Sequence, residues 1–331
     1  GGKLTVVNEE YTASITFEGT KTIVGREMTA ADVFTFEIVE GDTVIATATN
    51  DADGRIIYPQ IDYTMADVGE HTYTVKETST DGNGITVATN SYTVNVTVSD
   101  NGNGTLDLAI TGDDPEALDF QNTYAATGSL TLAGTKTLTG RDMTDIDVFT
   151  FEVSDGTTTW TATNDSTGTI DYPTISYTLA DVGEHVYTVK ETSVDGDGIT
   201  VDTNTYTVTV KVTDNKNGTL KVEPSANYTA LDFENKYAAT GSITFEGTKS
   251  IDTRDLTADD IFTFEVKEGD TVVATVNNDS TGKIAYPTIN YTLDDVGEHV
   301  YTVKETSEDA KGITVDTNTY TVTVNVIDNK N

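Results

Sequence analysis

Apolar and polar residues alternate along most of the chain, in short runs separated by turn residues. The run VFTFEIVEG, from Val33 to Gly41, places an apolar side chain at every second position. A period of two is typical of strands with one face on a core and the other in water. Turn signals such as Asp53-Gly54 and the segment Asp100 to Gly104 separate the runs. The pattern predicts an all-β chain with one helical turn, near Met28 to Asp32, for which Thr29 is the cap.

The chain contains three copies of one sequence. YTVKETSTDGNGITV starts at Tyr73, and close copies start at Tyr187 and Tyr301, so that the period is 114 residues (187 − 73 and 301 − 187). An immunoglobulin-like β-sandwich runs to roughly 100 residues. We therefore predict three tandem immunoglobulin-like β-sandwich domains, which we call repeats 1, 2 and 3, joined by short linkers into an elongated rod. Their predicted bounds are 13–124, 128–237 and 241–331, after a leading strand segment over 1–12.

Three polar residues in each of the first two repeats share the strand parity of apolar neighbours, which places them on the core side. They are Lys21, Glu77 and Asn122 in repeat 1, and Lys136, Glu191 and Asn235 in repeat 2. Burying any one of them charged and alone is very costly, so we expect the three of a repeat to meet.

A lysine, a glutamate and an asparagine that lie together in a core can react with one another. Burial lowers the pKa of an amine and raises that of a carboxyl group, so a neutral amine, which is a nucleophile, faces a protonated acid. We expect the acid to donate a hydrogen bond to the asparagine carbonyl and to carry the proton as ammonia leaves. The product is a Lys–Asn isopeptide bond. The alternative is a buried ion pair with a hydrogen-bonding amide.

These residues also carry a family resemblance. The lysine of GTK, the acid of YTVKE and the asparagine of FxNxY, with DVFTFE and DVGEH between them, resemble the isopeptide-linkage domains of Gram-positive pilins, whose fold is the collagen-adhesin B-type immunoglobulin-like sandwich. The resemblance implies a Lys21–Asn122 bond and a Lys136–Asn235 bond. It also implies that Glu77 and Glu191 are the catalytic acids of a single-turnover self-modification.

Repeat 3 holds Lys249 and the catalytic candidate Glu305, but its asparagine is expected near residues 348–350, and the chain has 331 residues. Repeat 3 is thus expected to lack its last strands and the partner of Lys249. One interpretation is that the chain is an excerpt cut out of phase with its domains. The other is head-to-tail strand addition, in which residues 3–12 of one chain complete repeat 3 of the next. Glu9, beside Asn8, holds the position of the asparagine, which favours plain strand pairing.

Composition excludes several functions. Nineteen basic and fifty-five acidic residues give a net charge of −36, which repels nucleic acid and anionic membranes. The chain has no cysteine, so a covalent staple needs other chemistry, and no run is apolar enough for membrane insertion. We expect no metal and no cofactor, because clusters such as Asp51 to Gly54 match turns. The GEH histidines, at 71, 185 and 299, lack paired ligands.

The sequence favours the structural stalk of an extracellular bacterial surface fibre, a pilus or adhesin in the cell wall, rather than a turnover enzyme. Its expected partners are like subunits or neighbouring repeats. The alternative is a set of adhesin repeats that recognise a host glycan or matrix protein, and near-identical repeats favour the stalk.

Overall fold

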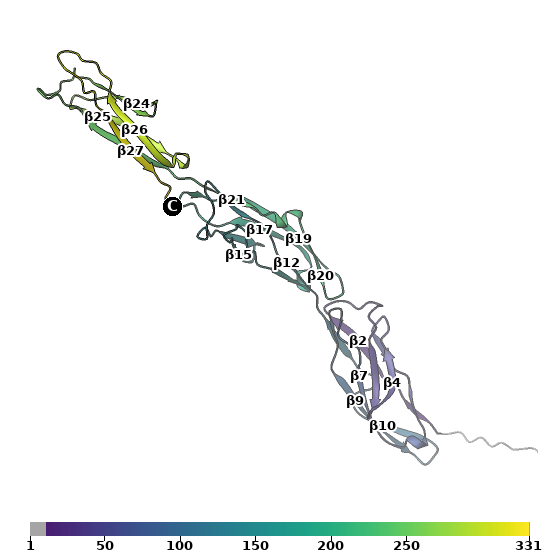
Figure 1. Cartoon of the computed structure of the whole chain (residues 1–331). Coiled ribbons are helices and arrows are strands. Elements are labelled where there is room, and N and C mark those ends of the chain that lie inside the picture. The colour runs from purple at the N-terminus through teal and green to yellow at the C-terminus, as the bar shows by residue number, and fades with distance from the viewer. Residues whose placement is uncertain (1–10, 331) are drawn as a thin grey trace, which may run out of the picture. The chain divides into compact units, whose positions relative to one another are not determined.

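A computed structural model describes residues 11–330, and strands make up most of it (Figure 1). The predicted all-β fold is confirmed. The chain divides into two compact units, and the boundary between them runs through repeat 2. One unit holds the residues up to Thr131 with Thr174–Val186 and Val208–Ala226, and the other holds Leu132–Pro173, Tyr187–Thr207 and the residues from Asn227 onward. The predicted leading segment lies almost wholly outside the described residues.

Repeat 1 consists of two main sheets. The first has the strand order β10 (Leu106–Gly112), β9 (Ser91–Asp100), β7 (Gly69–Glu77), β3 (Thr35–Glu40), β4 (Thr43–Thr49). The second has the order β5 (Arg55–Ile57), β2 (Glu18–Val24), β11 (Phe120–Tyr124), β8 (Ile85–Thr86), and a short pair joins β1 (Ala13–Ile15) to β6 (Ile61–Tyr63). Phe36 of β3 contacts Phe120 of β11 with ring centroids 5.1 Å apart, so the core lies between the two sheets.

The first and last strands of repeat 1 are neighbours. β2 and β11 run parallel, with Lys21 opposite Phe120 and Ile23 opposite Asn122. Gly19 permits their close approach, because a Cβ atom at this position would lie 1.8 Å from the carbonyl oxygen of Leu118. The structure divides the first strand of repeat 1 into two parts, β1 and β2, with residues 16 and 17 between them. Lys21 nevertheless stays on the buried face.

Repeats 2 and 3 share many of these strand pairings. In repeat 2, β12 (Thr127–Leu130) pairs with β16 (Ile175–Thr178). A second sheet has the order β13 (Lys136–Thr139), β21 (Phe233–Tyr237), β18 (Ile199–Thr200). The third has the order β15 (Thr159–Thr163), β14 (Thr150–Ser154), β17 (Gly183–Glu191), β19 (Thr205–Asp214), β20 (Leu220–Pro224). In repeat 3, β22 (Gly241–Thr248) pairs with β25 (Lys283–Tyr291), and a sheet has the order β24 (Thr271–Asn277), β23 (Thr263–Glu268), β26 (Gly297–Glu305), β27 (Thr319–Val326).

The helical turn predicted near Met28 to Asp32 is wrong. These residues form a non-helical turn, because the Asp32 carboxylate accepts hydrogen bonds from Arg26 at 2.6 and 2.8 Å and from the Thr29 backbone at 2.8 Å. Short 3₁₀ helices occur elsewhere, at Met65–Asp67, Leu179–Asp181, Ala226–Thr229 and Leu293–Asp295. No helix within residues 11–330 is long and apolar enough to cross a membrane.

The Arg–Asp pair that closes this turn recurs in repeat 2 and predicts a pH effect. Arg141 contacts Asp147 at 2.7 and 2.8 Å and lowers the pKa of this carboxyl group to about 2. A depressed folded-state pKa contributes stability above the unfolded value, and this stability is lost as the pH falls towards about 2. We expect Asp147→Asn to lower the free energy of unfolding at neutral pH by on the order of 2 kcal/mol and to flatten its pH dependence between about pH 4 and 2. Urea unfolding at several pH values measures both effects.

Asp145→Asn is the matched control for this prediction, because Asp145 is exposed in the same turn. An Asp147→Asn chain that keeps the pH dependence of the parent would contradict the account.

Candidate functional site

The three inward polar side chains of repeat 1 meet in its core. The Glu77 carboxylate lies between the other two: its Oε2 is 2.8 Å from Lys21 Nζ, and its Oε1 accepts a 2.9 Å hydrogen bond from Asn122 Nδ2. The side chains of Lys21 and Glu77 are fully buried, and so is Asn122. β2, β7 and β11 each supply one residue. Two strands of one sheet and one strand of the facing sheet therefore converge on a single polar cluster.

Repeat 2 reproduces this arrangement with small differences in distance. Glu191 Oε2 is 2.7 Å from Lys136 Nζ, and Glu191 Oε1 accepts a 2.8 Å hydrogen bond from Asn235 Nδ2. All three side chains are buried. We call the two clusters the Lys–Glu–Asn triads.

The surroundings of the two lysines make their ammonium groups easier to deprotonate. Burial lowers the pKa of Lys21, although its hydrogen bond to Glu77 opposes that effect, and the pKa of Lys136 is lowered in the same way. An aromatic ring borders each amine, with the Phe34 centroid 4.8 Å from Lys21 Nζ. A lysine that loses its proton more readily becomes a nucleophile at lower pH.

The orientation of the asparagine amide differs from the prediction. Asn122 Oδ1 accepts a 2.6 Å hydrogen bond from the backbone N–H of Ala88, and Asn235 Oδ1 accepts one of 2.7 Å from Asp202. Of the two amide atoms only Oδ1 accepts a hydrogen bond, so the backbone N–H holds Oδ1 and leaves Nδ2 facing the glutamate. The expected hydrogen bond from the acid to the amide carbonyl is therefore wrong. The backbone polarises the carbonyl, and the glutamate contacts the nitrogen that would leave.

A loop aspartate holds this backbone donor in position. Asp81 Oδ1 accepts the backbone N–H of Val87, at 2.8 Å, one residue before Ala88. Asp195 and Val201 repeat the contact at 2.8 Å in repeat 2. Sequence reasoning missed the donors because a backbone N–H carries no residue signature. The recurring aspartate of the ETSxD motif was the one available signal.

The Lys21–Asn122 bond predicted from the sequence is expected to form more slowly without the Ala88 donor. Ala88→Pro deletes the N–H that stabilises charge on Asn122 Oδ1, and loss of one such donor typically costs about 10²–10³-fold in rate. Mass spectrometry of freshly synthesised chains, sampled over time, measures the rate, and repeat 2 is the internal reference. Ala88→Gly keeps the donor and is the matched control. Equal rates for the proline and glycine variants would contradict this role.

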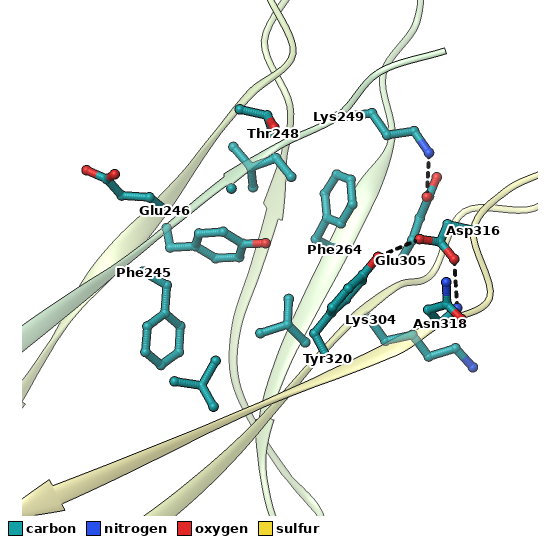
Figure 2. Close-up of a pocket in the computed structure, with 15 residues that line it drawn as sticks. Phe245, Glu246, Thr248, Lys249, Phe264, Lys304, Glu305, Asp316, Asn318 and Tyr320 are labelled. Carbon is teal, nitrogen blue, oxygen red and sulfur yellow. Dashed lines mark hydrogen bonds and ion pairs between the residues drawn. The ribbon is translucent and has the colours of Figure 1, made fainter. Parts of the chain in front are cut away.

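Repeat 3 contains the lysine and the acid of a triad (Figure 2). Lys249 Nζ lies 2.7 Å from Glu305 Oε2. Glu305 Oε1 is buried and has no hydrogen-bond partner among the described residues. A cavity of about 560 Å³ borders both side chains.

The remaining polar candidates have structural contacts. His71 contacts Glu40 through Nδ1 and the Asp67 carbonyl through Nε2, both at 2.8 Å. Asp51 Oδ1 accepts the backbone N–H groups of Asp53 and Arg55, as in a turn. Among residues 11–330, no group of three or more His, Cys, Asp or Glu side chains is placed to hold a metal ion.

Comparison with solved structures finds bacterial proteins, pilins among them, at low similarity. The major pilin T-13 of Streptococcus pyogenes is 16% identical, with a TM-score of 0.25, over 68% of this chain and 98% of the pilin. The T6 backbone pilin of S. pyogenes is 12% identical, with a TM-score of 0.20, over 97% and 81%. The Bacillus anthracis TIE protein is 13% identical, with a TM-score of 0.26, and this chain spans 48% of its length.

Comparison with curated proteins gives no match. A family model, described as FctA, Spy0128-like isopeptide containing domain, matches three times, over residues 17–125, 132–238 and 245–331. The three matches follow the three repeats and cover most of the chain. The chain therefore belongs to the family of Spy0128-like isopeptide containing domains.

Proposed function

We propose that this chain is a structural part of a bacterial surface fibre, the stalk of a pilus or adhesin, in which repeats 1 and 2 each form one intramolecular Lys–Asn isopeptide bond. The observation that carries the proposal is the pair of buried triads, with a carboxylate held between amine and amide in both. The family description names an isopeptide, which supports the proposal. The proposed domains keep the predicted bounds, 13–124, 128–237 and 241–331.

The reaction follows from the contacts in repeat 1. Neutral Lys21 Nζ attacks Asn122 Cγ, so that an Nζ–Cγ bond forms and the Cγ–Nδ2 bond breaks. Glu77 takes one proton from Nζ at Oε2 and supplies one to Nδ2 from Oε1, and ammonia leaves. The backbone N–H of Ala88 stabilises the charge that develops on Oδ1. The reaction consumes no oxidant, metal or cofactor, and Glu77 is unchanged at its end.

The buried alternative, an unreacted ion pair, explains less of the geometry. A buried Lys–Glu pair gains little net stability after desolvation, and it needs no asparagine. In both triads, however, the second carboxylate oxygen contacts the amide nitrogen, and a backbone N–H contacts the amide oxygen. Each amide thus receives one contact at its nitrogen and one at its oxygen, an arrangement suited to breaking the amide.

The position of the bond suits a fibre. Lys21 and Asn122 are 101 residues apart in sequence, yet they lie on the adjacent strands β2 and β11. A covalent bond between the first and last strands carries tension past the rest of the domain. It also gives a chain without cysteine a covalent cross-link that reductants cannot open.

The junctions between repeats support a tandem stalk of like units. Tyr124, at the end of repeat 1, donates a 2.7 Å hydrogen bond to Asp214 of repeat 2, and both residues lie in the same compact unit. Tyr237 and Asp328 repeat the contact at 2.5 Å. Because the same contact joins each repeat to the next, we propose that the partners of this chain are like repeats or like subunits.

The mass of the denatured chain tests the proposal. The expected value is the sequence mass less two ammonia masses, one for each complete triad. The sequence mass itself would contradict the cross-links.

A further inference from the structure

A second buried asparagine occupies the same place in every repeat, outside the triads. Asn50 comes directly after β4, Asn164 directly after β15 and Asn278 directly after β24. Their exposed fractions are 5%, 5% and 6%. A buried carboxamide needs hydrogen bonds for its oxygen and for both of its N–H groups. The partners of this side chain therefore show which part of the core it holds in place.

In repeat 1 these partners are backbone groups on either side of Val33. Asn50 Oδ1 accepts the N–H of Phe34 at 2.7 Å, and Asn50 Nδ2 donates to the carbonyls of Asp32 and Asp51 at 2.8 and 2.9 Å. Phe34 lies one residue before β3 begins, so the asparagine supplies the acceptor that a neighbouring strand supplies farther along. The side chain of Asn50 thus fixes the backbone of residues 32–34 to the end of β4.

Repeats 2 and 3 contain the same network. The N–H of Phe149 donates to Asn164 Oδ1 at 2.7 Å, and Asn164 Nδ2 donates to the carbonyls of Asp147 and Asp165 at 2.8 and 2.9 Å. Asn278 makes the three corresponding contacts at 2.7, 2.9 and 2.9 Å. The segment before β3, or before its counterpart, is therefore held in one way in every repeat.

The phenylalanine that is held in this way covers the lysine amine. The ring centroid of Phe34 lies 4.8 Å from Lys21 Nζ, that of Phe149 lies 4.9 Å from Lys136 Nζ, and the corresponding distance in repeat 3 is 4.5 Å. The two rings are buried, and the side chains of both lysines are fully buried. Because each ring fills the space beside an amine, it excludes water that would otherwise solvate the ammonium ion.

Exclusion of water affects how readily the amine loses its proton. Burial lowers the pKa of Lys21, and the hydrogen bond to Glu77, the charged group that faces this amine, opposes the effect. In repeat 2 the opposing groups are Glu191, Asp202 and Glu234. A ring face attracts an ammonium ion, but water at the same place would stabilise that ion more. The position of the ring therefore changes the fraction of the amine that is neutral.

We propose that Asn50 and Asn164 are positioning residues for isopeptide formation, because each holds the phenylalanine that keeps water away from the reacting lysine. The inference rests on the proposed function of the triads. Each asparagine contacts backbone groups and acts on the amine through the ring. Without its three hydrogen bonds, the segment before β3 or β14 loses its anchor, the ring moves, and water reaches the amine.

The test compares the pH dependence of the reaction in Asn50→Ala and in the unaltered chain. Freshly synthesised full chains are transferred to denaturant before the bonds form and are then refolded at a series of pH values. Mass spectrometry with peptide mapping follows the loss of ammonia in each repeat. Repeat 1 of the variant should react about tenfold more slowly at neutral pH, because a rise of about one unit in the amine pKa lowers the neutral fraction tenfold. The rates should converge at high pH, and repeat 2 should react at its usual rate throughout.

A role in stability alone predicts a different profile. It would slow repeat 1 of Asn50→Ala by the same factor at every pH, and that result would overturn the proposal. Thr64→Ala is the matched control in the same repeat. It removes the cap of the 3₁₀ turn Met65–Asp67, which precedes β7, whereas Glu77 lies at the far end of that strand. This control should keep the pH profile of the unaltered chain.

Two further variants settle the question if Asn50→Ala does not fold. In Asn50→Asp a protonated carboxyl group offers one acceptor and one donor, so this variant should match the unaltered chain at low pH and react more slowly once the group ionises. Combined with Phe34→Leu at neutral pH, it should cost less than the product of the two single losses, because both changes act through the ring. Losses that multiply fully would contradict the proposal.

The same masses distinguish this inference from the proposed function. If the unaltered chain loses no ammonia, the cross-links themselves are absent. If it loses two ammonia masses and the variants at position 50 keep its pH profile, the cross-links stand and the positioning role of Asn50 is wrong.

Discussion

Asn122→Ala is expected to lower the thermal unfolding midpoint of repeat 1 by on the order of 20 °C. The substitution removes the proposed bond between residues that are 101 apart in sequence, and by analogy with disulfides a closed loop near 100 residues contributes up to about 4.7 kcal/mol. One kcal/mol shifts the midpoint of a domain of about 100 residues by roughly 4 °C or more. The variant also leaves Lys21 and Glu77 buried without their third member. Differential scanning calorimetry resolves the transition of each repeat.

The control for this experiment lies on the same strand. Gln121 is exposed on the opposite face of β11, so Gln121→Ala should change the midpoint little. The transition of repeat 2 should stay in place in both variants, and Asn235→Ala should move that transition instead. If Asn122→Ala and Gln121→Ala unfold at similar temperatures, repeat 1 contains no bond of this kind.

Under mechanical extension, a repeat without the bond is expected to add much more contour length than a cross-linked repeat. With the bond formed, force enters β2, crosses to Asn122 and leaves through β11, so the residues between them are never stretched. Glu77→Ala blocks the reaction and exposes 101 residues to the force, which adds about 340 Å of contour length at about 3.4 Å per residue. Single-molecule force spectroscopy measures this step.

Glu191→Ala serves as the matched variant in repeat 2, where Lys136 and Asn235 are 99 residues apart. Each single variant should add one long step, and the double variant should add two. Long steps from repeats 1 and 2 of the unaltered chain would contradict the proposed path of force.

The residues of the triads could be predicted because the position of a residue along a strand determines which face of the sheet its side chain lies on. Side chains alternate with a period of two, so Lys21, Glu77 and Asn122 stand out as polar residues among apolar ones, and a repeated sequence shows the coincidence twice. Burial of all three follows from that parity. The break between β1 and β2 does not change the outcome, because Lys21 keeps its parity across it.

Other features of the fold and the site depend on contacts between distant parts of the chain, which the alternation of side chains along a strand does not predict. The amide of Asn122 is oriented by the backbone N–H of Ala88, which belongs to a loop far away in sequence. The turn before Phe34 is set by Arg26 and Asp32, whose ion pair outweighs the helical tendency of the residues between them. Within residues 11–330, Glu305 Oε1 has no hydrogen-bond partner, and this difference from Glu77 and Glu191 emerges only from a comparison of the three repeats in the structure.

The most direct test of the account is the intact mass of the denatured chain, measured beside Glu77→Ala and Glu191→Ala. The account predicts a deficit of two ammonia masses in the unaltered chain, one in each single variant and none in the double variant. A chain at its full sequence mass would show that the buried lysine, glutamate and asparagine are only a polar cluster, and the isopeptide mechanism would be wrong.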